Sequence, residues 1–319
     1  MTAAQQAAAF VALAALADDV FGKGAADRPA LVGPDTHSFK DAGSDVTKLI
    51  AYLKEFAAAA APVLSAITHH EYIEITADNV LNATFLDLTS TLAREMVAAV
   101  RAVSPTLAVW AGEIGPHNGG TYGPGGVTPN CAGNKVCGRF GSALWYADSM
   151  AAKARAGYAA YCRQDFIGAD YGLVNSTSFL PTPDFWLLVL WRKLVGRAVL
   201  AVAPPAPAAR SLRAYAFCGA APRTATLLLL NLAAVPACVA APAFAAPGAP
   251  LRVYALAPGA GGVESPAALL NGAPLALDAA GALPPLEPAE VNAAGGVTLP
   301  AMSVTLVSVD VAAGALADC

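Results

Sequence analysis

Residues 107–120, LAVWAGEIGPHNGG, join a short apolar run to a glycine-rich segment and carry one carboxylate, Glu113, at the junction. The apolar part, Leu107–Ala111, has the length and composition of a buried strand in a parallel sheet. The same order, an apolar run followed by polar or glycine-rich residues and a helical pattern, recurs up to about residue 200. This alternation predicts βα units that build a parallel sheet.

The other predicted elements complete four such units. Strands are also expected at Ala30–Val32, Ser65–Ile67 and Ala159–Arg163. Helices are expected at Asp45–Phe56, Leu88–Val103 and Ala143–Ala156. Four units are half of a (β/α)8 barrel, a fold whose sites lie at the carboxyl ends of the strands. Half a barrel leaves two sheet edges unpaired, through which the chain could self-associate.

The sequence changes character after Arg197. Short apolar segments such as LRAYAFC (212–218) and SVTLVSVDV (303–311) alternate there with turns rich in proline and glycine, without a convincing helical pattern. This spacing predicts an antiparallel β-sandwich. We therefore expect an α/β chain in which residues 1–197 form a partial (β/α)8 TIM barrel and residues 198–319 form a β-sandwich domain.

Composition argues against nucleic-acid and membrane partners. Charged residues make up 13% of the chain and the net charge is −4, so no basic face is available for a phosphate backbone. The longest stretch without charge, between Arg223 and Arg252, is interrupted by prolines, which favours strands and loops over a transmembrane span. The N-terminal segment MTAAQQAAAFVALAALADD lacks a basic start, and it predicts an amphipathic helix and no signal peptide in this chain.

Cysteine and glycine patterns predict neither a metal nor a cofactor. The six cysteines form no Cys-x-x-Cys pair or Cys/His cluster, and no phosphate-binding or dinucleotide fingerprint stands at a strand–helix junction. Cys131 and Cys137 bracket a short loop and could be bridged, and glycosylation sequons start at Asn82 and Asn175. These features favour an oxidising compartment.

Glu113 is the strongest candidate for chemistry. The glycines that follow it let a ligand approach the backbone closely, although its position alone is also typical of a solvated loop glutamate. His70 and Tyr72 share one face at the end of the preceding strand, and a tyrosine hydroxyl near Glu113 would stabilise the ionised carboxylate. Such a barrel mouth fits a carbohydrate, but glycoside hydrolysis needs a second carboxyl group. Glu71 is expected on the opposite face, and Glu74 lies further out.

Residues 161–196, YCRQDFIGADYGLVNSTSFLPTPDFWLLVLWRKLVG, strongly resemble the heparanase-like enzymes of glycoside hydrolase family 79, particularly their plant and algal branch. LVGPD, ITHHEY and VWAGEIG occur in the order that this family requires. The resemblance implies a retaining glycoside hydrolase, a heparanase or endo-β-glucuronidase, acting on uronic-acid-containing polysaccharide or proteoglycan glycans. The four units would be strands five to eight, the C-terminal half of the barrel, with Glu113 as the nucleophile.

The same resemblance implies roles for further residues. Substrate contacts are implied for Asp35, His70, Tyr72, Asn118, Gly119, Gly120, Gln164, Asp170 and Tyr171. The family often has tyrosine where this chain has Asn118. A cysteine pair in the family's β-sandwich implies a Cys218–Cys319 disulfide. The family also implies an extracellular, vacuolar or lysosome-like location.

The chain departs from the family pattern in one respect that bears on catalysis. The family's general acid is a glutamate that precedes a helix resembled here by AAQQAAAFVALAAL, so its counterpart is expected before Met1. We therefore expect an N-terminally truncated sequence that is inactive by itself. The alternative hypothesis is a non-catalytic remnant of the family that binds glycans or has a structural role.

Overall fold

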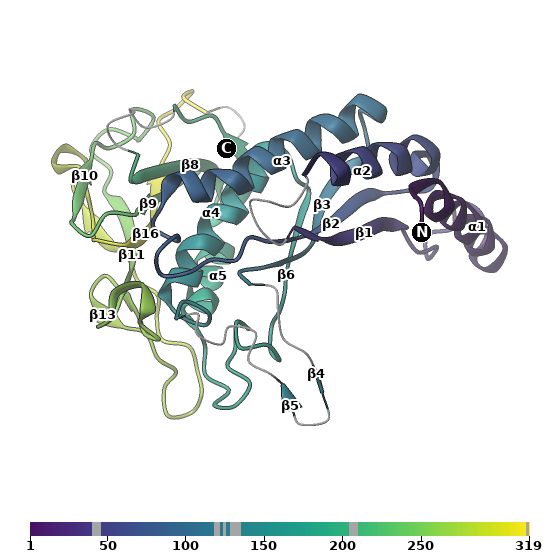
Figure 1. The fold of residues 1–319 in the computed structure, drawn as a ribbon. Helices are drawn as coiled ribbons and strands as arrows, with labels where there is room; N and C mark the ends of the chain where they lie inside the picture. Colours follow the sequence, from purple (N-terminus) through teal and green to yellow (C-terminus); the bar gives the residue numbers. More distant parts are fainter. Residues whose placement is uncertain (40–45, 118–121, 124–125, 128–134, 204–209, 317–318) are drawn as a thin grey trace. The chain divides into compact units, whose positions relative to one another are not determined.

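A computed structural model gives the fold of residues 1–319 and describes all of them except 40–45, 118–121, 124–125, 128–134, 204–209 and 317–318 (Figure 1). The chain forms two compact units, each assembled from separate segments. The first unit holds Met1–Glu74, Leu88–Asn118 and Ala152–Gln164. The second unit holds Ile75–Asp87, Gly119–Ala151 and Asp165–Cys319. The boundary expected at residue 197 stays a prediction.

Parallel strands form the sheet of the first unit, in the order β1-β2-β3-β6. Their bounds are Val32–Phe39 for β1, Ala66–Tyr72 for β2, Ala108–Gly115 for β3 and Ala160–Arg163 for β6. Helices α2 (Val46–Ala60), α3 (Ala83–Val103) and α4 (Phe140–Ala156) lie in the connections between these strands. The arrangement is the C-terminal half of a (β/α)8 barrel, with strands and helices alternating as the sequence predicts.

The strands extend further into polar sequence than expected. The predicted strand Ala30–Val32 is wrong except at its last residue, because β1 begins at Val32 and continues through the polar residues that follow. Strands β2 and β3 likewise continue to Tyr72 and Gly115. Parallel pairing with a neighbour satisfies the backbone of these polar residues, which an apolar pattern does not reveal. The candidate site residues therefore lie on strands as well as in loops.

The core of the first unit lies between the sheet and helices α2 and α3, which run together over the strands in Figure 1. Phe56 of α2 and Met96 of α3 are completely buried, and they cluster with Ile67 of β2 and Val109 of β3. These side chains recur on one face of each helix and alternate along each strand, as amphipathic elements require. This packing fixes the strands whose ends carry the candidate site.

Helix α1 (Ala3–Phe21) packs against α2 and begins with a capping box in which Thr2 and Gln5 bond each other's backbone. Its buried residues are alanines, whereas Val20 is 66% exposed and Leu16 is 58% exposed. The expected helix is confirmed, but Phe10 is the one large apolar side chain of its described residues that packs against the core cluster. Among the described parts of the chain, α1 is the one helix long and apolar enough to cross a membrane by length and composition alone.

The second unit contains an antiparallel β-sandwich. Its main sheet has the strand order β13-β12-β11-β16-β9-β8-β7, with β14 paired to β11, and β10 pairs with β15 in a separate ribbon. The bounds are β7 Val195–Leu200, β8 Leu212–Gly219, β9 Thr224–Asn231, β10 Ala237–Val239, β11 Leu251–Pro258, β12 Ala268–Leu270, β13 Ala273–Pro274, β14 Ala289–Val291, β15 Val297–Leu299 and β16 Ser303–Asp310. Val307 of β16 and Leu251 of β11 pack with Val297 of β15 in the core between the two layers.

Shorter elements complete this unit. They are the ribbon strands β4 (Tyr122–Gly123) and β5 (Gly126–Val127), helix α5 (Pro183–Leu194), and short 3-10 turns at Gly262–Glu264 and Ala293–Gly295. A further 3-10 turn, Ala61–Val63, ends α2 in the first unit. Helix α5, with the sequence PDFWLLVLWRKL, leads directly into β7, so that this helix and the first sandwich strand are continuous in the chain.

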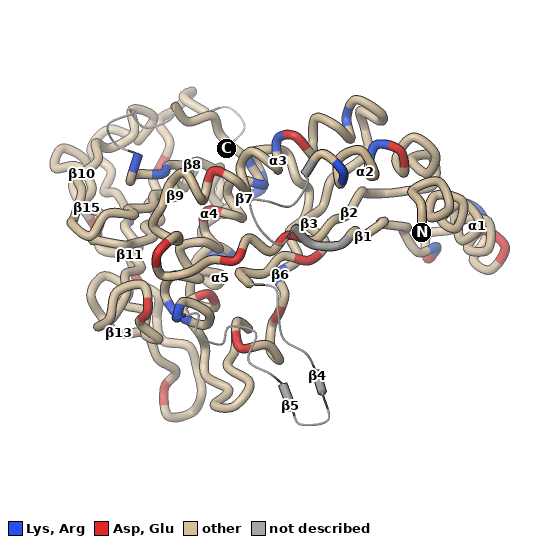
Figure 2. The backbone as a smooth tube through the Cα atoms, in the orientation of Figure 1, with Lys and Arg blue, Asp and Glu red and all other residues tan. Residues whose placement is uncertain are grey.

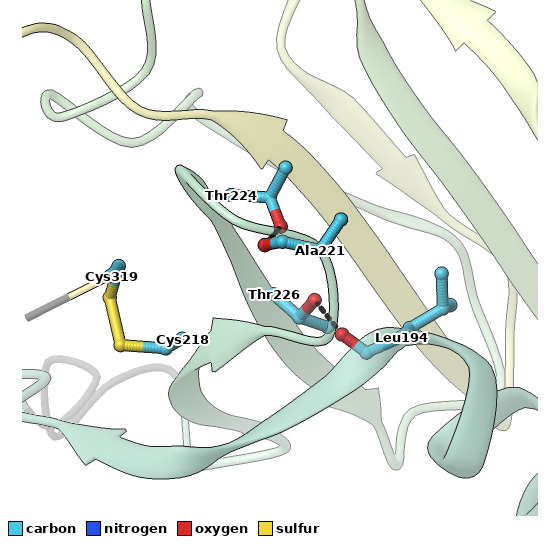
Figure 3. Close-up of a disulfide and its surroundings, with 6 residues drawn as sticks. All are labelled: Leu194, Cys218, Ala221, Thr224, Thr226 and Cys319. Atoms are coloured by element: carbon cyan, nitrogen blue, oxygen red, sulfur yellow. Dashed lines mark hydrogen bonds between the residues drawn. A yellow bond between two sulfur atoms is a disulfide. The ribbon is translucent and has the colours of Figure 1, made fainter.

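A disulfide joins Cys218 at the end of β8 to Cys319, with the two sulfur atoms 2.07 Å apart (Figure 3). This is the pairing implied by the family resemblance. Nearby, Thr226 donates a hydrogen bond to the carbonyl of Leu194, with a distance of 2.7 Å. Cys137 is also disulfide-bonded, and Cys131 lies outside the described residues.

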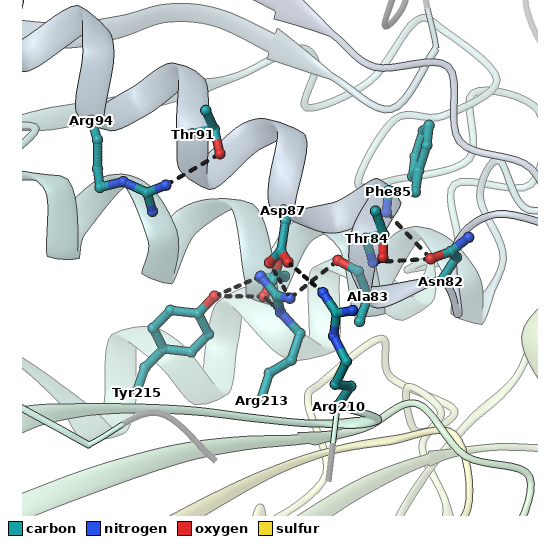
Figure 4. A network of polar contacts seen from close by, with 11 residues as sticks. Asn82, Ala83, Thr84, Phe85, Asp87, Thr91, Arg94, Arg210, Arg213 and Tyr215 are labelled. Atoms are coloured by element: carbon teal, nitrogen blue, oxygen red, sulfur yellow. Dashed lines mark hydrogen bonds and ion pairs between the residues drawn. The ribbon is translucent and has the colours of Figure 1, made fainter. Parts of the chain in front are cut away.

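A polar network around Arg213 ties β8 to residues of α3 and α4 (Figure 4). The Arg213 guanidinium donates to Asp148 at 2.5 Å and to Asp87 at 2.8 Å, and the Tyr215 hydroxyl donates to Asp148 at 2.6 Å. Burial alone would lower the pKa of Arg213, but the adjacent Asp148 carboxylate more than offsets it, so the pKa is raised. Elsewhere charged residues are sparse along the backbone tube in Figure 2.

Candidate active site

Glu113 owes its orientation to a β-bulge in β3. His69 pairs with Ala111 and His70 pairs with Glu113, so Gly112 is an extra residue in β3. Side chains alternate between the two faces of a strand, and one extra residue changes the face on which the next side chain lies. The bulge therefore places Glu113 on the same face of the sheet as its partner His70.

Two side chains of β2 hold the Glu113 carboxylate. The Tyr72 hydroxyl donates a hydrogen bond to Oε1 of Glu113 at 2.5 Å, and Nδ1 of His70 lies 3.5 Å from the same oxygen. The carboxylate side chain remains 34% exposed, so a ligand can reach it. Gly115 makes room for the tyrosine, because a Cβ there would lie 2.3 Å from the Tyr72 ring. The predicted contact between Tyr72 and Glu113 is confirmed.

Asp35 of β1 contacts the other side of the His70 ring. Its Oδ2 atom lies 2.9 Å from Nε2 of His70, a close ion-pair contact rather than an aligned hydrogen bond. Asp35 is half exposed and has a φ of 55°, in the left-handed region. Carboxylates therefore approach both nitrogens of one imidazole ring, with Glu113 on the Nδ1 side.

A second histidine–carboxylate pair lies at the same ends of the strands. Nε2 of His117, just after β3, lies 2.8 Å from Oε2 of Glu74, just after β2. The sequence reasoning noted Glu74 only as a distant alternative acid and did not single out His117. Their shared position after neighbouring parallel strands was the available signal, because such positions meet at one edge of a sheet.

The opposite face of β2 carries a buried polar network. Oε1 of Glu71 accepts hydrogen bonds from Lys153 at 2.8 Å and from Thr89 at 2.7 Å. The Glu71 and Lys153 side chains are 0% and 1% exposed. The prediction that Glu71 points away from Glu113 is thus supported by its partners, and Lys153 is the residue that the sequence reasoning missed.

His69 belongs to the same buried region. Its Nδ1 lies 3.2 Å from the His70 carbonyl, and its Nε2 lies 2.8 Å from the Tyr158 hydroxyl. A carbonyl can only accept, so Nδ1 carries the proton and Nε2 accepts from Tyr158. Burial lowers the pKa of His69 from 6.5 to about 4 and keeps the ring neutral. His69 is therefore a core residue, in contrast to its neighbour His70.

The remaining predicted residues have different outcomes. Gln164 follows β6 at the site end of the sheet, and its backbone N–H donates to the Ile114 carbonyl at 2.9 Å. Asp170 is exposed and Tyr171 is buried, and both belong to the second unit. Asn118, Gly119 and Gly120 lie outside the described residues. Within the described segments, no group of three or more His, Cys, Asp or Glu side chains could hold a metal ion.

Relatives of known name share this sequence over much of its length, although no family model matches it. Heparanase-like protein 3 of Arabidopsis thaliana is 28% identical over 275 residues, which are 76% of this chain and 49% of the relative. Mouse heparanase is 30% identical over 86% of this chain and 50% of its own length. The chain is similar in sequence to heparanases and heparanase-like proteins.

A third relative is baicalin-β-D-glucuronidase of Scutellaria baicalensis. It is 26% identical over 72% of this chain and 42% of its own length. The chain thus spans about half the length, or less, of the curated relatives that it matches.

Solved glycosidase structures share the fold. The family 51 arabinofuranosidase of Xanthomonas axonopodis pv. citri aligns with a TM-score of 0.65 at 14% identity, over 97% of this chain and 63% of that chain. A 4-O-α-L-rhamnosyl-β-D-glucuronidase of Fusarium oxysporum aligns with a TM-score of 0.60 at 16% identity, over 97% of this chain and 65% of that chain. At these identities the likeness concerns the fold alone, a barrel followed by a β-sandwich.

Proposed function

We propose that this chain carries the nucleophile of a retaining glycoside hydrolase that acts on glucuronide-containing glycans of polysaccharides or proteoglycans. The observation that carries the proposal is the partly exposed Glu113 carboxylate at the carboxyl end of β3, held by the Tyr72 hydroxyl at 2.5 Å. The names of the relatives, heparanase and β-D-glucuronidase, support the class of substrate.

In the proposed reaction a carboxylate oxygen of Glu113 attacks the anomeric carbon, and the glycosidic C–O bond breaks. A general acid protonates the departing oxygen, and a glycosyl ester on Glu113 remains. The same acid, now a base, takes a proton from water, which attacks the anomeric carbon and releases Glu113 as a carboxylate. The Tyr72 hydroxyl stabilises Glu113 whenever it is ionised, before the attack and during its release.

We place the general acid outside this chain. Glu71 is engaged by Lys153 and Thr89 behind the sheet, and Glu74 is paired with His117. A retaining pair requires two carboxyl groups about 5–5.5 Å apart on either side of the sugar, and we propose neither glutamate for that role. The chain alone is then expected to turn over ordinary glycosides very slowly or not at all.

The remaining functional assignments are part of the same proposal. Gln164, Asp170 and Tyr171, with Asn118, Gly119 and Gly120, are proposed to contact the sugar. The Cys218–Cys319 disulfide supports folding in an oxidising compartment such as the endoplasmic reticulum, and we propose an extracellular, vacuolar or lysosome-like location. Strands β1 and β6 are the two edge strands of the parallel sheet, and we propose that these edges allow self-association.

An activated substrate tests the nucleophile without the missing acid. The leaving group of 2,4-dinitrophenyl β-D-glucuronide departs without protonation, so attack by Glu113 alone would release dinitrophenolate in a burst of at most one equivalent per chain. Glu113→Gln should abolish the burst, and the exposed Glu95→Gln control should retain it. Equal release from wild type and Glu113→Gln would refute the assignment. A folded wild-type chain without any burst would favour a glycan-binding remnant.

A further inference from the structure

Asp35 has a backbone conformation that its sequence alone does not explain. Pro34 pairs with Thr68 and Thr36 pairs with His69, so Asp35 is an extra residue in β1. Its φ of 55° lies in the left-handed region, which residues other than glycine adopt at a cost. Backbone strain of this kind persists where the surrounding structure imposes it, and it often marks a functional constraint.

The neighbouring strand is shaped to receive the Asp35 side chain. A Cβ at position 112 would lie 2.1 Å from Oδ1 of Asp35 and 3.0 Å from Cβ of Thr68, so glycine at this position leaves room for the carboxylate where it lies. Gly112 is itself the bulge residue that turns Glu113 onto the site face. Two bulges, one on each side of β2, therefore meet at the Asp35 carboxylate.

The Asp35 carboxylate ends a chain of contacts that leads to Glu113. Its Oδ2 lies 2.9 Å from Nε2 of His70, and Nδ1 of the same ring lies 3.5 Å from Oε1 of Glu113. The sequence resemblance implies a sugar contact for Asp35, but the structure gives its carboxylate a partner within the protein. A carboxylate on one edge of an imidazole ring orients the opposite edge, as carboxylates do for histidines at other sites.

We propose that Asp35 is a positioning residue, which holds the His70 ring so that its Nδ1 edge faces the Glu113 carboxylate. The inference rests on the proposed function of Glu113, but the contact between Asp35 and His70 can be tested without it. Asp35→Asn keeps the size of the side chain and removes its charge. Asp18→Asn is the matched control, because Asp18 also forms an ion pair, with Arg28, but on α1.

The first test observes the His70 ring directly. The chain contains only four histidines, so long-range ¹H–¹⁵N spectra of the ¹⁵N-histidine-labelled protein are simple, and the His70 signals are assigned by their loss in His70→Gln. Asp35→Asn should move the His70 ring signals and leave those of His117 in place, and the Asp18→Asn control should leave both unchanged. His70 signals that coincide in wild type and Asp35→Asn would overturn the proposal.

The second test separates positioning from sugar binding. With 2,4-dinitrophenyl β-D-glucuronide, loss of positioning lowers the burst rate constant by about 10- to 100-fold while the half-saturating concentration stays unchanged. A raised half-saturating concentration with an unchanged rate constant would mean that Asp35 binds the sugar, and it would overturn the positioning role. Failure of the wild-type burst would refute the proposed function, and the ring spectra would then decide the Asp35 contact alone.

Discussion

The buried His69 makes the stability of the chain depend on pH in a calculable way. Its ring is neutral in the folded protein, with a pKa of about 4 against 6.5 for a free histidine, because burial disfavours the charged form. Between these values the unfolded chain binds more protons than the folded chain. Acidification through this range therefore favours unfolding, and the stabilisation that neutral His69 allows is fully present only above about pH 6.5.

The magnitude follows from the size of the pKa change. Each unit corresponds to about 1.4 kcal/mol, so the complete change from 6.5 to about 4 corresponds to roughly 3 kcal/mol. Between about pH 7.5 and pH 5, most of the unfolded chains become protonated at this histidine while most folded chains do not. Acidification over that interval should therefore lower the free energy of unfolding by roughly 2 kcal/mol through His69.

Denaturant unfolding of wild type and His69→Gln at both pH values measures this contribution, since the other titrating groups affect both proteins and largely cancel in the difference. Wild type should lose about 2 kcal/mol more than His69→Gln on acidification. Equal losses in wild type and His69→Gln would show that His69 is not held neutral, and the reasoning from burial would fail.

Two further predictions concern stability. Lys153→Met leaves Glu71 buried without its cation and should lower the free energy of unfolding by about 3–5 kcal/mol. Glu71→Leu combined with Lys153→Met should restore most of that loss in the same unfolding assay. A double variant that loses as much as the two single variants together would contradict this. Cys218→Ser removes the Cys218–Cys319 disulfide, which closes a loop of 101 residues. In the chain-entropy model this should lower the free energy of unfolding by about 4–5 kcal/mol. An unchanged midpoint of denaturant unfolding would contradict that.

The arrangement of strands was readable from the sequence because alternating apolar runs and helical patterns leave few topologies. The shared face of His70 and Tyr72 followed from the period of two along a strand, and the contact of Tyr72 with Glu113 followed from the proximity of adjacent strand ends. The β-sandwich was evident from its short strands and turns. These features depend on local periodicity, which a single sequence contains.

The bulges and the buried ion pair were not readable in this way. A bulge is a property of strand pairing, so the extra residues Asp35 and Gly112 leave no mark on the apolar pattern. Lys153 lies 82 residues from Glu71 in the sequence, and a lysine on a helix is usually exposed. The N-terminal helix buries alanines and exposes larger apolar side chains, which the expectation of an ordinary amphipathic helix did not anticipate.

Trapping the covalent intermediate would show directly whether Glu113 is the nucleophile. The chain would be incubated with 2,4-dinitrophenyl 2-deoxy-2-fluoro-β-D-glucuronide, whose fluorine slows release of the sugar and whose leaving group needs no acid, and then digested for peptide mass spectrometry. We expect one added fluoroglucuronosyl group on the peptide that contains Glu113, with none in Glu113→Gln. An adduct on another residue, or the same adduct in Glu113→Gln, would contradict it.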